Sequence, residues 1–133
     1  MGIQWTNDFL VGNPTIDRQH KELFRAFGEL VDACRLGKGK NKIEELLDFL
    51  EVYVIFHFDA EEKLMEQSNY PGREAHRTAH AGFISQLKEL KIMFGKDGAS
   101  MELLITTNET VLRWLIEHIR KTDTALGAYL KTV

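Results

Sequence analysis

All five histidines of this 133-residue chain fall on the apolar side of helical sequence patterns. A single histidine in such a position is more often a hydrogen-bonded core residue than a metal ligand. Five buried imidazoles, however, need five sets of hydrogen-bond partners that the sequence does not otherwise supply. A shared metal site would satisfy them together. The candidate ligands are His20, His57, His76, His80 and His118.

Two pairs of residues have the spacing of neighbours on one helix face. His76 and His80 are four residues apart, and so are His57 and Glu61, so the members of each pair point in the same direction from a helix. Each pair alone is weak evidence, because a His–Glu pair at this spacing is usually surface electrostatics. Glu61, however, falls on an apolar stripe, where a carboxylate is costly unless it is paired or binds a cation.

The segment EHIRKTDTAL, residues 117–126, contains a different spacing. His118 and Asp123 are five residues apart, and five steps of about 100° turn a side chain about 140° beyond one full turn of an α-helix. The two side chains can meet only if the helix widens into a π-type turn or ends between Ile119 and Asp123. We predict such a departure, because a straight α-helix would leave Asp123 in solvent.

The elements that would hold these residues follow from helical periodicity. Four amphipathic patterns predict four helices, and short loops rich in glycine, such as RLGKGKNK, or containing proline, such as SNYPGR, separate them. The helices are expected from Asp17 to the glycines at 37 and 39, from about Asn41 to Gln67, from about Arg73 to Phe94 and from about Met101 to Lys121. This order predicts an all-α fold, an antiparallel up-down-up-down four-helix bundle.

Both ends of the chain lie outside these helices. Residues 1–16 contain Gly12, Asn13 and Pro14 and predict an N-terminal arm across the bundle, whereas ALGAYLKTV predicts a short C-terminal helical tail packed back on it. The segment TTNET, residues 106–110, is a poor helix former and predicts a bend in the fourth helix. We expect one domain, residues 1–133, with the bundle and tail over 17–133.

Composition excludes several classes of function. The net charge of −3 contains no run of like charges that indicates a nucleic-acid or polybasic membrane site. No apolar stretch approaches the ~18 residues of a membrane span, and the first residues do not resemble a secretory signal. We therefore expect a cytoplasmic protein, with a monomer favoured. The one cysteine, Cys34, is expected to be a small buried thiol.

The motifs IDRQHKELF, HFDAEEKLM, HRTAH and WLIEHIRKTD resemble those of bacterial hemerythrins, the non-haem di-iron oxygen-binding bundles. The similarity spans Trp5 to Tyr129. It implies two iron ions bridged by an oxo or hydroxo group and by two carboxylates. The ligands that it implies are His76, His80 and His118 for one iron, His20 and His57 for the other, and Glu61 and Asp123 as the bridges.

The resemblance also implies an open position for a small ligand. Two octahedral ions offer twelve positions, of which three bridges fill six and five histidines fill five, so one remains on the iron with two histidines. The expected function is reversible dioxygen binding for storage, delivery or sensing, and not catalysis. The apolar residues at the family's oxygen-pocket positions, for each of which plain core packing is an equal explanation, are Phe58, Trp114, Leu115 and Ile119.

Two alternatives from other functional classes remain open. One is a di-iron redox enzyme that reduces peroxide or nitric oxide, and the other is a protein that buffers iron without gas chemistry. Gln19, next to the candidate ligand His20, has two possible roles. It either hydrogen-bonds an imidazole or faces solvent, and its place at the start of a helix favours the second. Three acidic residues are interpreted as solvated charge, namely Asp59, Glu62 and Glu66.

Overall fold

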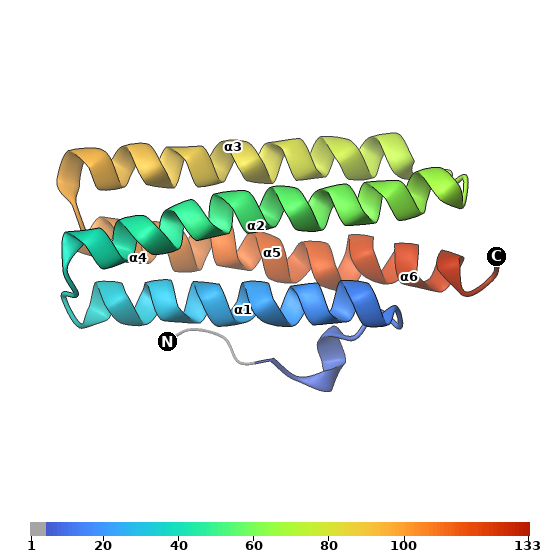
Figure 1. The fold of residues 1–133 in the computed structure, drawn as a ribbon, viewed down its shortest axis with the longest axis horizontal. Helices are drawn as coiled ribbons and strands as arrows, with labels where there is room; N and C mark the ends of the chain where they lie inside the picture. Colours follow the sequence, from blue (N-terminus) through green and yellow to red (C-terminus); the bar gives the residue numbers. More distant parts are fainter. Residues whose placement is uncertain (1–4) are drawn as a thin grey trace.

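The computed structural model describes residues 5–133, and the first four residues of the predicted arm lie outside that range. Four helical rods lie side by side and alternate in direction (Figure 1). The first three are α1 (Pro14–Arg35), α2 (Lys40–Gln67) and α3 (Arg73–Asp97). The fourth is a succession of segments, namely α4 (Met101–Thr106), η2 (Thr107–Leu112), α5 (Arg113–Glu117), η3 (His118–Asp123) and α6 (Thr124–Leu130). The predicted all-α four-helix bundle is confirmed.

The first helix begins at Pro14, three residues before the predicted start at Asp17. The Asn13 side chain accepts a hydrogen bond from the backbone N–H of Ile16 across 3.1 Å, and proline is favoured at the first helical position. The predicted arm boundary at residue 16 was therefore wrong, because Asn13 and Pro14 cap and start the helix.

The N-terminal arm contacts both the first helix, α1, and the last helical segment, α6. The Asp17 carboxylate accepts hydrogen bonds from the backbone N–H groups of Val11, across 2.8 Å, and Gly12, across 3.3 Å. Gly127 of α6 lies so close to the Val11 carbonyl that a side chain at this position would clash with it. The arm thus packs on the C-terminal segment of the fourth rod and encloses that end of the core.

The fourth rod does not end at Lys121 but continues through α6, and this segment confirms the predicted C-terminal helical tail packed on the bundle. The backbone N–H of Thr124 donates to the Ile119 carbonyl, so backbone hydrogen bonding continues from η3 into α6. The side chain of Leu126 in α6 is buried in the core. The TTNET segment forms most of η2, where the predicted bend takes the form of a π segment. The buried Thr107 hydroxyl donates to the Leu103 carbonyl across 2.7 Å within this segment, so the poor helix formers widen the helix without ending it.

Two smaller expectations also need correction. The third helix runs to Asp97, three residues past Phe94, and ends at Gly98, whose φ of 68° is the left-handed conformation that glycine favours. Cys34 is partly buried and not fully buried, because α1 ends at the next residue. Within residues 5–133, no helix has both the length and the apolar character that crossing a bilayer requires.

Candidate metal centre

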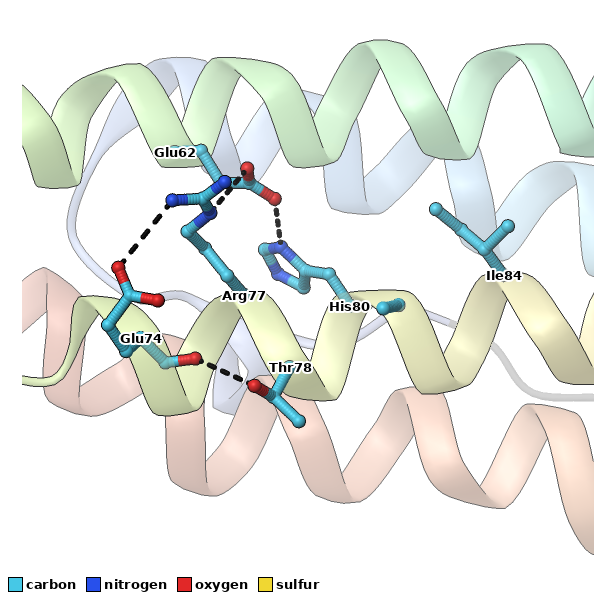
Figure 2. Close-up of a pocket in the computed structure, with 7 residues that line it drawn as sticks. Glu62, Glu74, Arg77, Thr78, His80 and Ile84 are labelled. Carbon is cyan, nitrogen blue, oxygen red and sulfur yellow. Dashed lines mark hydrogen bonds and ion pairs between the residues drawn. The ribbon is translucent and has the colours of Figure 1, made fainter.

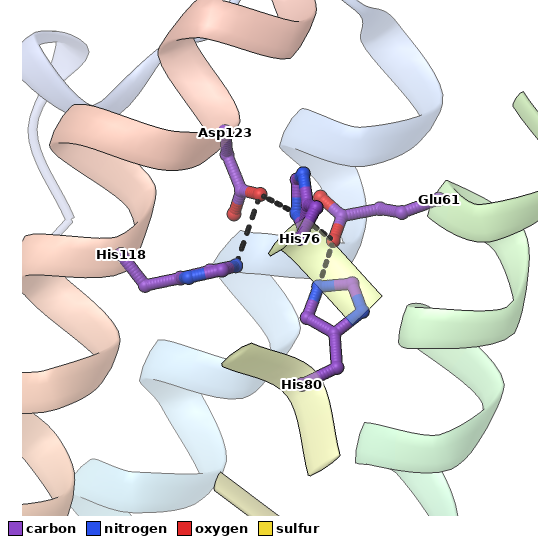
Figure 3. Close-up of side chains that lie close together, drawn as sticks. All are labelled: Glu61, His76, His80, His118 and Asp123. Carbon is purple, nitrogen blue, oxygen red and sulfur yellow. Dashed lines mark ion pairs between the residues drawn. The ribbon is translucent and has the colours of Figure 1, made fainter. Parts of the chain in front are cut away.

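All seven predicted ligand side chains converge in one buried cluster between the four rods, and none is more than 6% exposed. Five of them are drawn in Figure 3. Their ligand atoms form two groups, and the atoms of each group lie within 4.8 Å of one another. Glu61 and Asp123 belong to both. The larger group adds His76, His80 and His118, and the smaller adds His20 and His57. We call these the three-histidine group and the two-histidine group.

The two oxygens of Glu61 face different groups. Oε1 lies 3.0 Å from the His80 Nε2 and 3.6 Å from the His76 Nε2. Oε2 lies 3.6 Å from the His57 Nε2 and 3.7 Å from the His20 Nε2. This carboxylate therefore stands between the two groups with one oxygen toward each.

Asp123 divides the imidazoles in the same way. Its Oδ1 lies 2.9 Å from the His76 Nε2 and 3.3 Å from the His118 Nε2. Its Oδ2 lies 3.0 Å from the His20 Nε2. Taken together, the two carboxylates separate His76, His80 and His118 from His20 and His57, which is the geometry of two adjacent metal positions with shared carboxylate ligands.

The π segment η3 brings His118 and Asp123 together. It spans His118–Asp123 and closes with the Thr124 backbone N–H on the Ile119 carbonyl, five residues back. The Thr124 hydroxyl donates to the same carbonyl across 2.9 Å. A π turn contains one residue more than an α turn, so residues five apart can share a face. The predicted departure from α-helix between Ile119 and Asp123 is confirmed.

The inner atoms of the cluster lack hydrogen-bond partners. All five Nε2 atoms and all four carboxylate oxygens are buried without a partner of hydrogen-bond geometry in the described part of the chain. Burying so many polar atoms without partners costs free energy of folding. Two cations would satisfy them, and a donor set of imidazole nitrogens and carboxylate oxygens suits iron among other transition metals. The residues present therefore fit a di-metal centre.

Charges in the cluster shift the pKa values of its histidines in opposite directions. Burial disfavours the imidazolium form, but Asp123 and Glu61 outweigh burial and raise the pKa of His20 and of His76 to about 9. Burial dominates at His57 and lowers its pKa to about 4. Burial also opposes ionisation of Asp123, yet its close contacts with the imidazoles of His118, His20 and His76 hold the pKa well below the usual range. Without metal, His20 and His76 therefore hold protons at neutral pH.

Two histidines are also held on the side away from the cluster. The His57 Nδ1–H donates to the Gln19 amide oxygen across 2.6 Å, and the His80 Nδ1–H donates to the Glu62 carboxylate across 3.1 Å. These bonds fix the tautomer that leaves Nε2 free to bind a metal. Of the two alternatives for Gln19, the hydrogen bond to an imidazole is confirmed and the favoured one, a residue facing solvent, was wrong. The interpretation of Glu62 as solvated charge was also wrong.

Gln19 and Glu62 differ in the sequence signal that they carry. Gln19 follows Ile16 by three residues and precedes Leu23 by four, so it continues the buried stripe of α1. That position was a usable signal. Glu62 is oriented by its contact with α3, which the pattern of α2 does not reveal. Asp59 and Glu66 are exposed, as predicted.

All four apolar candidates are at least partly buried, and two of them stack on histidines of the cluster. Phe58, Leu115 and Ile119 are buried, and Trp114 is partly buried. The Phe58 ring stacks on the His80 imidazole with 3.7 Å between centroids and 4° between planes. Trp114 stacks on His118 with 4.5 Å between centroids. The two aromatic rings therefore cover imidazoles of the three-histidine group.

Comparison with known proteins places these features in a family. The family described as Hemerythrin HHE cation binding domain matches residues 11–130. The bacteriohemerythrin of Pseudomonas aeruginosa strain LESB58 is 35% identical over 124 residues, which cover 91% of this chain and 76% of that protein. The myohemerythrin of Theromyzon tessulatum is 27% identical over 90% of this chain and 87% of its own.

A solved structure agrees with this assignment. The crystal structure of wild-type hemerythrin superposes with a TM-score of 0.84 at 30% identity, covering 96% of this chain and 97% of that one. The sequence motifs, the bundle and the buried cluster of histidines and carboxylates all point to the same conclusion. The chain belongs to the hemerythrin family.

Proposed function

We propose that this protein holds two iron ions and binds dioxygen reversibly, for storage, delivery or sensing. The iron ions, when bound, would supply the electrons that reversible dioxygen binding requires. The three-histidine group would hold one ion and the two-histidine group the other, with Glu61 and Asp123 shared. The observation that carries the proposal is the unequal division of five histidines by both carboxylates.

This division leaves one position with fewer protein donors. If the carboxylates serve both ions, the two-histidine position has one imidazole less, so a small external ligand can enter there and not on the other side. The donor set is also rich in neutral nitrogen, whereas ferritin-like di-iron sites use about four glutamates with two histidines. Fewer anionic ligands favour the reduced ions and therefore reversible binding over oxidative turnover.

The apolar residues around the cluster would protect such a site. We propose that Phe58, Trp114, Leu115 and Ile119 form the oxygen pocket and exclude water and reductants from it. Phe58 supports this role, since its ring covers one face of His80 and lies 5.7 Å from the His57 ring. Its side chain is thus close to a histidine of each group.

Anaerobic loading with Fe(II) followed by cycles of oxygenation tests the proposal. We expect two ions per chain and a visible absorption band that appears when dioxygen is admitted and vanishes when it is removed, over repeated cycles. Irreversible conversion with turnover of peroxide and reductant would instead indicate the redox enzyme. One bound metal per chain without such a band would indicate a metal-buffering protein.

Two variants of α2 distinguish the contribution of the metal centre from that of the rest of this helix. His57→Ala removes a ligand of the two-histidine group and should abolish the reversible band. Asp59→Asn removes an exposed carboxylate two residues away on α2 and should leave the band unchanged.

A further inference from the structure

The hydrogen bonds on the outer side of the centre differ in charge between the two groups. His57, in the two-histidine group, donates through Nδ1–H to the neutral amide of Gln19. His80, in the three-histidine group, donates through Nδ1–H to the Glu62 carboxylate. The Nδ1 atoms of His20 and His76 have no partner in the described part of the chain. The outer surroundings of the two metal positions are therefore chemically unequal.

Glu62 is held by contacts on both of its oxygens (Figure 2). Its Oε2 accepts from His80, and its Oε1 lies 3.4 Å from the Nε of Arg77. Arg77 is itself held by Glu74, with 3.5 Å between Nη1 and Oε1. These residues line a surface pocket of about 370 Å³, and the buried His80 imidazole forms part of its wall. The Glu62 carboxylate is thus oriented toward His80 from the rim of this pocket.

We propose that Glu62 and Gln19 are positioning residues that give the two metal positions different reduction potentials. A carboxylate that accepts a hydrogen bond from the outer nitrogen of a ligating imidazole makes the inner nitrogen a stronger donor. Stronger donation stabilises the more oxidised ion, so the ion bound by His80 has the lower potential. The neutral amide of Gln19 is a weaker hydrogen-bond acceptor than a carboxylate, so it strengthens the inner nitrogen of His57 less. The ion bound by His57 therefore has the higher reduction potential.

The inference rests on the proposed iron occupancy but not on dioxygen binding. The first electron to leave the reduced centre comes from the ion of the three-histidine group, where the protein supplies more donors. The ion of the two-histidine group, which has the open position, is the harder one to oxidise. Glu62 and Gln19 would in this way protect the ligand-binding ion from losing its electron.

Stepwise oxidation of the Fe(II)-loaded protein tests the proposal. Each equivalent of ferricyanide takes one electron from one ion, and a spectroelectrochemical titration gives the two potentials. Glu62→Gln keeps an acceptor oxygen and removes the charge, and Gln19 shows that this bundle accommodates an amide acceptor on a ligand histidine. We expect the first potential to rise by the equivalent of roughly a tenfold change in the Fe(III)/Fe(II) ratio, about 59 mV. Gln19→Glu should lower the second potential by a similar amount.

Glu66→Gln is the matched control for the loss of charge. Glu66 lies one helical turn beyond Glu62 on α2, is exposed, and lines the neighbouring pocket with Arg73 and Arg77. It makes no hydrogen bond to a histidine within residues 5–133, so its variant should move neither potential appreciably. The proposal is overturned if Glu62→Gln shifts the first potential no more than Glu66→Gln does, or lowers it.

The outcome is distinguishable from failure of the proposed function. If the wild-type protein binds two irons without a reversible dioxygen band, the proposed function is wrong and the potentials still decide the role of Glu62. If the wild-type protein binds no iron, both proposals fail. Gln19→Glu tests separately whether the charge of the acceptor sets the reduction potential, because it adds a charge on α1 without altering Glu62.

Discussion

Replacing Phe58 by alanine should destabilise this protein far more than replacing Phe56, two residues away on the same helix. Phe58 is 2% exposed and stacks on His80, whereas Phe56 is 55% exposed and packs beside Tyr53. A fully buried phenylalanine covers roughly 150–250 Å², which at ~25 cal/mol per Å² corresponds to about 4–6 kcal/mol as an upper value. Buried Phe→Ala changes cost about 3–5 kcal/mol.

We therefore expect Phe58→Ala to lower the free energy of unfolding by about 4 kcal/mol, because it leaves a cavity beside His80. Phe56→Ala should lower it by about 1 kcal/mol or less, because an exposed ring leaves no cavity. Denaturant unfolding of the metal-free protein, followed by circular dichroism, measures both values. In the iron-loaded protein, Phe58→Ala should also speed irreversible oxidation, since water then reaches the His80 face. The reasoning fails if the two variants differ by less than about 1 kcal/mol.

Two glycines and two histidines lead to further predictions. Gly127→Ala should destabilise the protein by more than about 2 kcal/mol because the new methyl group meets the Val11 carbonyl. Gly28→Ala, with open space around its position in α1, should instead stabilise it by up to about 1 kcal/mol, and thermal unfolding compares the two. His20 and His76 have pKa values raised to about 9, so metal must displace their protons. The apparent Zn²⁺ affinity should rise roughly tenfold per pH unit per displaced proton between pH 7 and 9, then level off, and calorimetry that finds a constant affinity contradicts this.

The candidate ligand positions were predictable because metal binding requires polar residues on faces that packing makes apolar. His57 and Glu61 interrupt the stripe of α2, and His118 interrupts that of the fourth rod, so each exception is visible within one helix. The five-residue step to Asp123 was informative for the same reason, since only a π turn or an early helix end reconciles it with a shared site. Each of these arguments uses the geometry of a single helix.

Other features were harder to predict although their signals are local. Asn13 and Pro14 are good cap and first-turn residues, but the same two residues are also typical of loops, and only the hydrogen bond from Ile16 decides between the two structures. The tail after Lys121 was predicted to be helical and packed on the bundle, but whether it would continue the fourth helix was left open. It continues the helix because the wider turn of η3 satisfies the backbone without a break.

The sequence by itself determined the four amphipathic helices, the seven inward polar residues and the need for a departure from α-helix before Asp123, because all of these follow from periodicity along one helix. The tertiary structure decided that this departure is a π turn and not a helix end. Only the tertiary structure decided how Glu61 and Asp123 divide the histidines. It alone decided that Gln19 meets His57, 38 residues away, and that Glu62 meets His80, 18 residues away. These contacts depend on the rotation and axial offset of one helix against another, which packing of whole helix surfaces sets and no local pattern encodes.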